Sequence, residues 1–426
     1  MKGTSSLARN ARAPMIALIT LSLLNLLNYV DRYVVSSLVP FLEKSIDQGG
    51  LALTHAQSGW LYSAFIVVYM IAAPAFGLIA DRFPRLHVLA AAVAFWSVLT
   101  FLGGFAWGFW SLLIMRALTG IGEAAYGSVA PAVLADEFPA KQQSRAMAFF
   151  NAAIPVGAAI GFTLGGVVGS KYGWREAFFV AGGPGLFLAL VIYFIRDPQR
   201  GAKDEHVVVN APPTVRDAVG ILFRPRWLWT TMGYALQTAG FGSLGFWTPT
   251  YLDKAWGLSV ESSSTMFGAV IVVTGITGTL AGGFLGDWWF QRNRTAHLWI
   301  CGLTSFLAAA SILFVLFAPN ITAMWCGITL GSFFLVMSVG PVHAHLVHIL
   351  NPAERGTGMA LAILVLHLLG DVPAVPMIGW IAEGSGWKTA YMSIPIFIFL
   401  AGLIWCGGAI YERRLHSQTS NSIAHV

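Results

Sequence analysis

Long apolar runs separated by short polar turns make up almost the whole chain. An α-helix needs about 20 apolar residues to cross a hydrocarbon core roughly 30 Å thick, and most runs reach that length. The runs are continuous, whereas strands of a membrane β-barrel alternate apolar and polar positions. The pattern therefore predicts helices. We expect twelve spans, at residues 14–40, 56–80, 86–106, 109–136, 143–170, 175–195, 227–252, 262–287, 296–318, 322–349, 355–382 and 388–410.

One connection, at residues 196–226, is much longer and more polar than the others. It contains the run RDPQRGAKDEH and the pair Pro212 and Pro213, a composition that is typical of a linker. We therefore predict a six-helix bundle over residues 1–195, a cytoplasmic linker over 196–226 and a second six-helix bundle over 227–426.

Composition agrees with a membrane protein. Hydrophobic residues make up 56% of the 426 residues and charged residues only 10%, against about 25% charged residues in soluble domains. The three cysteines are scattered singly, so no disulfide framework or metal-binding spacing is indicated. The basic start is followed by an apolar run too long for a signal peptide, which predicts a retained first helix.

Lysine and arginine are distributed unevenly among the connections. Most of the 25 basic residues lie at the two termini, in the linker and in alternate loops, which places these segments in the cytoplasm. The net charge of +6 then reflects topology and contact with anionic membrane lipids, and no nucleic-acid partner is expected. The short tails favour a multi-pass protein of a bacterial inner (plasma) membrane, and we expect a monomer.

The chain also repeats itself. GWREAFFV at 173–180 and GWKTAYMS at 386–393 lie 213 residues apart, which is half of the chain, and the same offset pairs Gly157 with Gly370. Duplicated halves of six helices are typical of transporters that rock around a central site. The predicted fold class is an all-α membrane protein with twelve transmembrane helices in two pseudo-symmetric six-helix bundles.

Four charged residues interrupt two of the predicted spans in the first half: Asp31, Arg32, Arg116 and Glu123. A charge facing lipid costs several kcal/mol, so these side chains should face inward. Arg116 and Glu123 are two helical turns apart and share a face. At a rise of about 1.5 Å per residue, the charged residues of the two helices lie at overlapping depths in the membrane. We therefore expect the four side chains to meet, either in a wet cavity or as ion pairs.

This arrangement predicts a proton-linked site for an anion. Protonation of Asp31 would free Arg32 or Arg116 to bind an anionic head group, and the planar fork of arginine suits phosphate. Protons are thus the expected coupling ion, and no organic cofactor or metal is expected. The alternative is a structural salt bridge that joins helices.

The second half carries a more aromatic set of candidates. His367 and Asp371 lie one turn apart on one helical face. The candidate cavity residues on the predicted seventh and tenth helices are Gln237, Phe241, Phe246, Trp247 and Phe333. A cavity with one charged and one aromatic side would suit an amphipathic substrate. The alternatives are that the aromatic residues pack or face lipid, and that His367 and Asp371 only join helices.

Two loops carry a related pattern of glycine and charged residues: Gly77, Asp81, Arg82 and Arg85 in the first half, with Asp287 and Arg292 as a weaker copy in the second half. This pattern resembles the gating motif of the major facilitator superfamily. The resemblance implies that the motif holds the cytoplasmic side closed in one state. Pro84 stands where the family usually has glycine.

Five further stretches are distributed along nearly the whole chain: NYVDRY, RALTGIGEAAYGSVAP, GWREAF, GITGTLAGGFLGD and LHLLGDVPAVPMIGWIAE. Together they are similar to the spinster family of this superfamily. The resemblance implies export or exchange of amphipathic lipids, such as lysophospholipids and sphingosine-1-phosphate, by alternating access. It also implies that Asp31 takes part in proton-linked switching. Glu383 and Trp288 depart from the pattern.

Two other functions stay open at this point. The same arginines could bind a small organic anion such as a carboxylate. An intramembrane enzyme or a receptor is the second alternative, but the chain holds no Gly-x-Ser-x-Gly, His-Glu-x-x-His or nucleotide-binding motif. His343, His345 and His348 raise the question of a metal site, but only the last two share a helical face.

Overall fold

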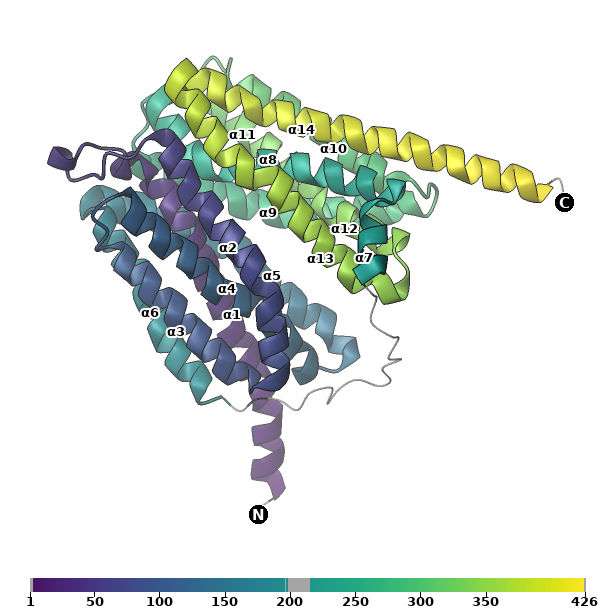
Figure 1. Cartoon of the computed structure of the whole chain (residues 1–426), viewed down its shortest axis with the longest axis horizontal. Coiled ribbons are helices and arrows are strands. Elements are labelled where there is room, and N and C mark those ends of the chain that lie inside the picture. The colour runs from purple at the N-terminus through teal and green to yellow at the C-terminus, as the bar shows by residue number, and fades with distance from the viewer. Residues whose placement is uncertain (1–2, 196, 198–214, 425–426) are drawn as a thin grey trace. The chain divides into compact units, whose positions relative to one another are not determined.

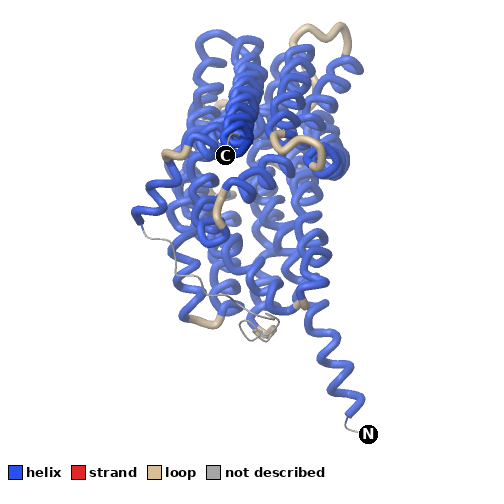
Figure 2. Tube along the Cα trace, turned by 90° about the vertical axis from the view of Figure 1, so that its right-hand side faces the viewer, coloured by secondary structure: helices blue, strands red, loops and turns tan. Residues whose placement is uncertain are grey.

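A computed structural model describes residues 3–195, 197 and 215–424. Helices dominate this part of the chain, and no strand occurs in it (Figures 1 and 2). The α-helices are α1 (Gly3–Leu42), α2 (His55–Arg82), α3 (Arg85–Gly103), α4 (Phe109–Glu137), α5 (Ala140–Lys171), α6 (Trp174–Tyr193), α7 (Val215–Leu222), α8 (Pro225–Trp256), α9 (Val260–Phe290), α10 (Ala296–Val315), α11 (Ile321–Met337), α12 (Val339–Ile349), α13 (Arg355–Leu366) and α14 (Val372–Ala424).

The helices account for the twelve predicted membrane spans. Among the described residues, nine segments are long and apolar enough to cross a membrane. One of them, Arg355–Leu415, contains two predicted spans, because the chain turns at Gly386 with a φ of +79°. Helices α4 and α8, with 29 and 32 residues, are also long enough to cross. The prediction of an all-helical membrane protein is therefore confirmed.

Two predicted spans are less regular than the apolar pattern indicated. The tenth is divided at Ser338 into α11 and α12. The eleventh contains a π-helical turn, His367–Asp371, in which Gly370 leaves helical geometry with φ −101° and ψ −105°. Hydrophobic patterning reports which residues avoid water, and it does not report local changes in hydrogen-bond register. Single π-helical turns are frequent at functional sites.

The chain divides into two compact units that differ from the predicted halves. Unit 1 comprises Met1–Val208 and Pro249–Val272, and unit 2 comprises Val209–Thr248 and Val273–Val426. The start of α9 belongs to unit 1 because it packs on α5, where the rings of Phe162 and Phe267 lie 5.0 Å apart. Helix α7 lies within the predicted linker and packs on α13, and residues 196 and 198–214 of that linker lie outside the described residues.

Glycines bring α1 and α5 of unit 1 close together. Gly157, Gly161 and Gly165 recur every four residues on the face of α5 that meets α1. A Cβ added at Gly161 would lie 2.6 Å from the carbonyl oxygen of Val30, and the other two positions are similarly tight. Small residues at this spacing allow two membrane helices to pack by direct backbone contact.

We expect Gly161→Leu to destabilise the protein by about 1–3 kcal/mol, because overpacking forces a tightly packed backbone apart. Thermal unfolding in detergent measures the effect. Gly183→Leu on α6 is the matched control, since a Cβ there meets nothing within 4 Å. Equal unfolding temperatures for the two variants would show that the α1–α5 contact is not tight.

Matching local geometry in the two units supports the internal duplication. Gly173 and Gly386 both adopt positive φ, at +115° and +79°, directly before the equivalent helices. Helix α3 packs on α6 in unit 1, as α10 packs on α14 in unit 2. Gly157 lies against α1, and Gly370 lies against α8, where an added Cβ would be 2.5 Å from a carbonyl oxygen.

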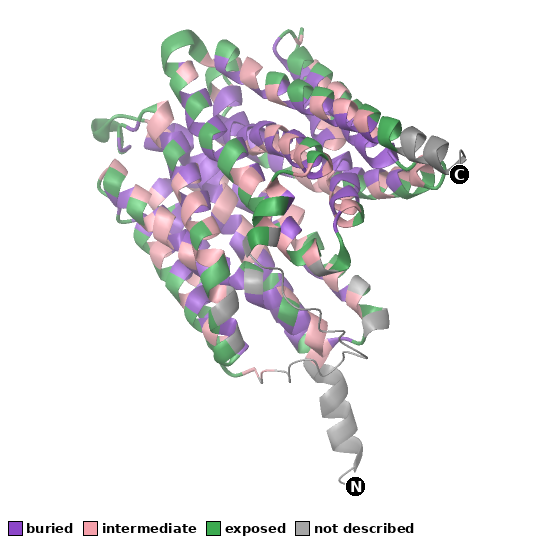
Figure 3. Cartoon of the chain, turned by 45° about the vertical axis from the view of Figure 1, so that its right-hand side comes forward, coloured by how far each residue is buried: buried purple, intermediate pink, exposed green. Residues whose placement is uncertain are grey.

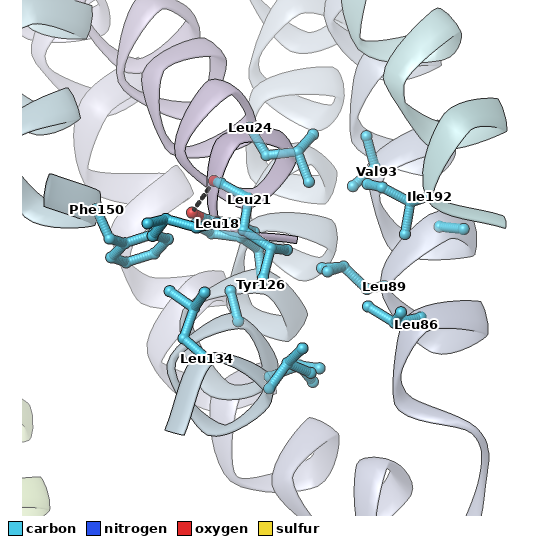
Figure 4. Packing of buried hydrophobic residues seen from close by; sticks show 14 of the residues in the cluster. Leu18, Leu21, Leu24, Leu86, Leu89, Val93, Tyr126, Leu134, Phe150 and Ile192 are labelled. Carbon is cyan, nitrogen blue, oxygen red and sulfur yellow. Dashed lines mark hydrogen bonds between the residues drawn. The ribbon is translucent and has the colours of Figure 1, made fainter. Parts of the chain in front are cut away.

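The apolar core of unit 1 fixes the helices that carry the charged residues. It lies between α1, α3, α4, α5 and α6, and buried residues follow the inner faces of these helices (Figure 3). Within it, the hydroxyl of Tyr126 donates a hydrogen bond of 3.0 Å to the carbonyl oxygen of Leu21 (Figure 4). Tyr126 lies less than one turn from Glu123, so this contact sets the register of α4 against α1 at the charged site.

Candidate functional site

The first ion pair of the site joins α1 to α4. Arg116 Nη1 lies 3.1 Å from Asp31 Oδ1, and both side chains are buried. The hydroxyl of Thr100, on α3, donates a hydrogen bond of 2.7 Å to the other carboxylate oxygen of Asp31. Three helices therefore converge on one buried carboxylate, and Thr100 holds it independently of Arg116.

The second ion pair crosses between the same two helices. Arg32 Nε donates a hydrogen bond of 2.7 Å to Glu123 Oε2. The side chain of Arg32 is 22% exposed, while that of Glu123 is fully buried. The guanidinium carbon of Arg32 also lies 5.0–5.2 Å from the ring centres of Tyr29, Phe65 and Tyr69. Aromatic faces stabilise a partly desolvated guanidinium at such distances.

Two glycines place α4 deep enough to form these pairs. A Cβ at Gly120 would lie 2.5 Å from the carbonyl oxygen of Phe65 on α2. A Cβ at Gly122 would lie 2.7 Å from the carbonyl oxygen of Ala92 on α3. Because α4 contacts both neighbours by its backbone, the run RALTGIGE presents Arg116 and Glu123 to α1.

The expected meeting of the four charged side chains in the first bundle is confirmed. The adjacent residues Asp31 and Arg32 of α1 bind Arg116 and Glu123, which lie two turns apart on α4. Within the described residues, Glu123 Oε1 and Arg116 Nε are buried without a hydrogen-bond partner. Buried polar atoms are nearly always satisfied in proteins, so the unsatisfied state of these two atoms is unusual. The roles of the four residues in transport stay predictions.

In unit 2 the structure joins His367 to Asp371. His367 Nδ1 lies 2.9 and 3.0 Å from the two carboxylate oxygens of Asp371, within the π-helical turn. Gln237 is also buried; its amide nitrogen donates to the carbonyl oxygen of Leu335, at 2.8 Å, and to the hydroxyl of Ser338. The amide oxygen of Gln237 has no partner among the described residues.

The aromatic candidates do not share one environment. Trp247 is fully buried and donates a hydrogen bond of 2.9 Å to the carbonyl oxygen of Val375 on α14. Phe246 is buried as well, and its ring lies 4.9 Å from that of Trp247; a role of the two rings in substrate binding stays a prediction. Phe241 and Phe333 are partly exposed. Residue type along a helix does not reveal which aromatic ring faces the packed side, and this explains the difference.

The first copy of the gating motif contains a buried cluster that the sequence did not reveal. Arg85 is buried, and its Nη1 donates a hydrogen bond of 2.5 Å to Asp136 at the end of α4. Its backbone N–H donates a hydrogen bond of 2.6 Å to Asp197, after α6. Both contacts lie within unit 1. The acidic end of α4 was the only sequence signal for this cluster, and an acidic residue at a helix end is too common to identify a partner.

The remaining motif residues whose surroundings the structure describes are exposed near helix ends. Arg82 is exposed, and the surroundings of Gly77 and Asp81 lie outside the described part of the structure. Asp287 and Arg292 are both exposed near the end of α9. Arg292 donates a hydrogen bond of 3.1 Å to the carbonyl oxygen of Trp288, and its guanidinium lies over the ring of the same residue. Their gating role stays a prediction.

The described residues thus form a helical membrane fold in which α1, α3 and α4 meet at buried charged side chains. The sequence profile of the Major Facilitator Superfamily matches residues 21–370. In structure, the chain resembles a bacterial homolog of the human lysosomal transporter Spinster in an inward-facing, unoccupied conformation. That likeness has a TM-score of 0.84 at 20% identity and covers 93% of this chain and 97% of the other.

Sequence relatives narrow the class further. The chain is 32% identical to protein spinster homolog 1 of Xenopus laevis over 390 residues, which is 87% of this chain and 73% of that protein. It is also 32% identical to protein spinster homolog 1 of Homo sapiens over 394 residues, which is 87% of this chain and 74% of that protein. The chain is 28% identical to the sphingosine-1-phosphate transporter SPNS2 of Xenopus tropicalis over 430 residues, and the alignment covers 94% of this chain and 82% of that protein. The chain belongs to the spinster family of major facilitator transporters, and it is not an enzyme.

Proposed function

We propose that the protein moves an amphipathic anionic lipid, of the lysophospholipid or sphingosine-1-phosphate class, by proton-coupled alternating access. The observation that carries this proposal is the crossed pair Asp31–Arg116 and Arg32–Glu123, in which Glu123 Oε1 and Arg116 Nε lack partners among the described residues. We further propose a monomer in a bacterial inner membrane with both termini in the cytoplasm, on the basis of the uneven distribution of lysine and arginine.

The geometry supports a specific order of events. A proton on Asp31 neutralises the carboxylate and weakens its bond to Arg116, while the Thr100 hydroxyl keeps the side chain in place. Arg116 is then available to an anionic head group, and the more exposed Arg32 is the arginine that such a group reaches first. Binding of the anion and uptake of the proton thus favour each other, so anion affinity should rise as pH falls.

A lipid cargo is supported by the named activity of the SPNS2 relative and by the partly exposed Phe241 and Phe333. A small organic anion is the second candidate. The observation in its favour is that Phe246 and Trp247 are buried in packing, which reduces the aromatic surface available to an acyl chain. His367 and Asp371 are proposed as a second polar contact for either cargo.

A binding screen at two pH values separates the two cargoes. We expect purified protein to bind lysophospholipids more tightly at pH 5.5 than at pH 7.5, and dicarboxylates weakly at both. Arg32→Ala should lower lysophospholipid affinity about tenfold or more, the cost of one charge-assisted hydrogen bond. Arg145→Ala is the matched control, because it removes an exposed arginine of the same unit. Tighter binding of dicarboxylates would select the second cargo, and unchanged lysophospholipid binding by Arg32→Ala would exclude the site.

A further inference from the structure

A separate cavity lies in unit 2, between the start of α8, the end of α12 and residues 411–415 of α14. Its volume is about 260 Å³. Arg224 and Arg226 line it at the start of α8, Leu350 at the end of α12, and Tyr411 and Leu415 on α14. Two membrane spans, Ile321–Ile349 and Arg355–Leu415, end at these residues, so the cavity lies at the edge of the apolar zone.

The charge presented to the cavity is positive, although both arginines have acidic partners. Arg226 Nε lies 2.7 Å from Glu412 Oε1; the arginine side chain is 42% exposed and the glutamate only 2%. Arg224 binds Glu354 through both terminal nitrogens, at 2.6 and 2.7 Å, and is again the more exposed partner. The carboxylates therefore lie behind the guanidinium groups and hold them in place.

These carboxylates stay ionised under ordinary conditions, so the arginines stay oriented. Hydrogen bonds from Arg224 lower the pKa of Glu354 below its usual value. Glu412 has a second partner, because His345 Nε2 lies 3.2 Å from the same oxygen that binds Arg226. Glu412 is bound by Nε of Arg226, so the terminal nitrogens of Arg226 can meet an anion that enters the cavity, and such a pair suits two phosphate oxygens at once. Arg224 uses both terminal nitrogens to bind Glu354 and adds positive charge beside this contact.

The apolar wall of the cavity indicates the source of the phosphate. Leu350, Leu415 and the ring of Tyr411 border the arginines at the level where membrane spans end. Phospholipid head groups lie at this level, and basic pockets between helix ends bind them. A cavity of about 260 Å³ is below the roughly 300–1,000 Å³ of pockets that enclose drug-sized ligands, so it would hold a head group and leave the acyl chains outside.

We propose that this cavity binds the anionic phosphodiester head group of a bilayer phospholipid, as a resident ligand distinct from the transported substrate. Arg226 supplies the main contact and Arg224 the second one. The first carbons of the acyl chains lie against Leu350 and Leu415. The ligand would join the start of α8 and the end of α12 to residues 411–415 of α14.

Lipid binding by native mass spectrometry in neutral detergent tests the proposal. Phosphatidylglycerol should bind at least tenfold more tightly than phosphatidylcholine with the same acyl chains. Arg226→Gln should lower the affinity for phosphatidylglycerol about tenfold or more. Arg413→Gln, which removes an exposed arginine next to Glu412 on α14, should leave it unchanged. Equal binding of the two lipids, or unchanged binding by Arg226→Gln, would overturn the proposal.

Two further variants separate loss of binding from loss of folding. Glu412→Gln keeps the guanidinium group and should retain phosphatidylglycerol binding. The double variant Arg226→Gln/Glu412→Gln leaves no unpaired buried carboxylate, so it should unfold near the wild-type temperature and still lose binding. Displacement of the lipid by millimolar inorganic phosphate would assign the cavity to a soluble anion and contradict a lipid site.

Discussion

Asp31→Asn is expected to abolish transport driven by a pH gradient while leaving substrate binding measurable. Asparagine cannot exchange a proton, and it resembles a protonated aspartate that has already released Arg116. Affinity for the anionic substrate should therefore become nearly independent of pH. In the wild type the affinity should change by up to about tenfold per pH unit, because one proton is linked to binding.

Uptake of a labelled lysophospholipid into proteoliposomes, with and without an imposed pH gradient, measures this effect. Glu261→Gln serves as the control, since it removes an exposed carboxylate of the same unit. Gradient-driven transport by Asp31→Asn at the wild-type rate would exclude Asp31 as the coupling residue. A binding affinity that still follows pH in this variant would place the linked proton on another group.

Arg116→Leu is expected to have a large effect on stability. Among the described residues it leaves the buried carboxylate of Asp31 with the Thr100 hydroxyl as its hydrogen-bond partner. Removing one partner of a buried ion pair costs about 3–5 kcal/mol. Arg32→Leu should cost about as much, because it leaves the fully buried carboxylate of Glu123 without its ion-pair partner. Unfolding in denaturant, compared across the three proteins, provides the measurement.

A double replacement separates a structural role from a functional one. Asp31→Leu/Arg116→Leu removes both charges, and replacing a buried ion pair with apolar residues is often neutral for stability. We expect this variant to regain most of the stability that Arg116→Leu loses and to remain inactive in transport. If it transported substrate like the wild type, the pair would serve only to join α1 and α4.

Hydrophobic patterning was sufficient for the fold of this chain, because lipid imposes one simple rule on every span. It could not indicate the π-helical turn at His367–Asp371 or the division at Ser338, where the residues stay apolar or small while the hydrogen-bond register changes. Hydrophobic patterning also could not assign residues 249–272 to unit 1. That grouping depends on a contact between α5 and α9, two helices that are far apart in the sequence.

The charged site could be predicted because charged residues within membrane spans are rare and must face inward. Four charges within apolar spans have few acceptable positions, so spacing and depth were enough to bring Asp31, Arg32, Arg116 and Glu123 together. Thr100 was missed because a threonine in a membrane helix is unremarkable by sequence. The burial of Trp247 could not be predicted, since helical position without a known neighbour does not define its face.

The central claim is that anion binding at the crossed ion pairs is linked to uptake of a proton. The most direct test adds substrate to purified protein in a weakly buffered solution and follows the pH. Wild-type protein should take up about one proton per bound lysophospholipid at a pH where Asp31 is ionised in the free protein, and Asp31→Asn should take up none. Binding without proton uptake by the wild type would contradict the claim.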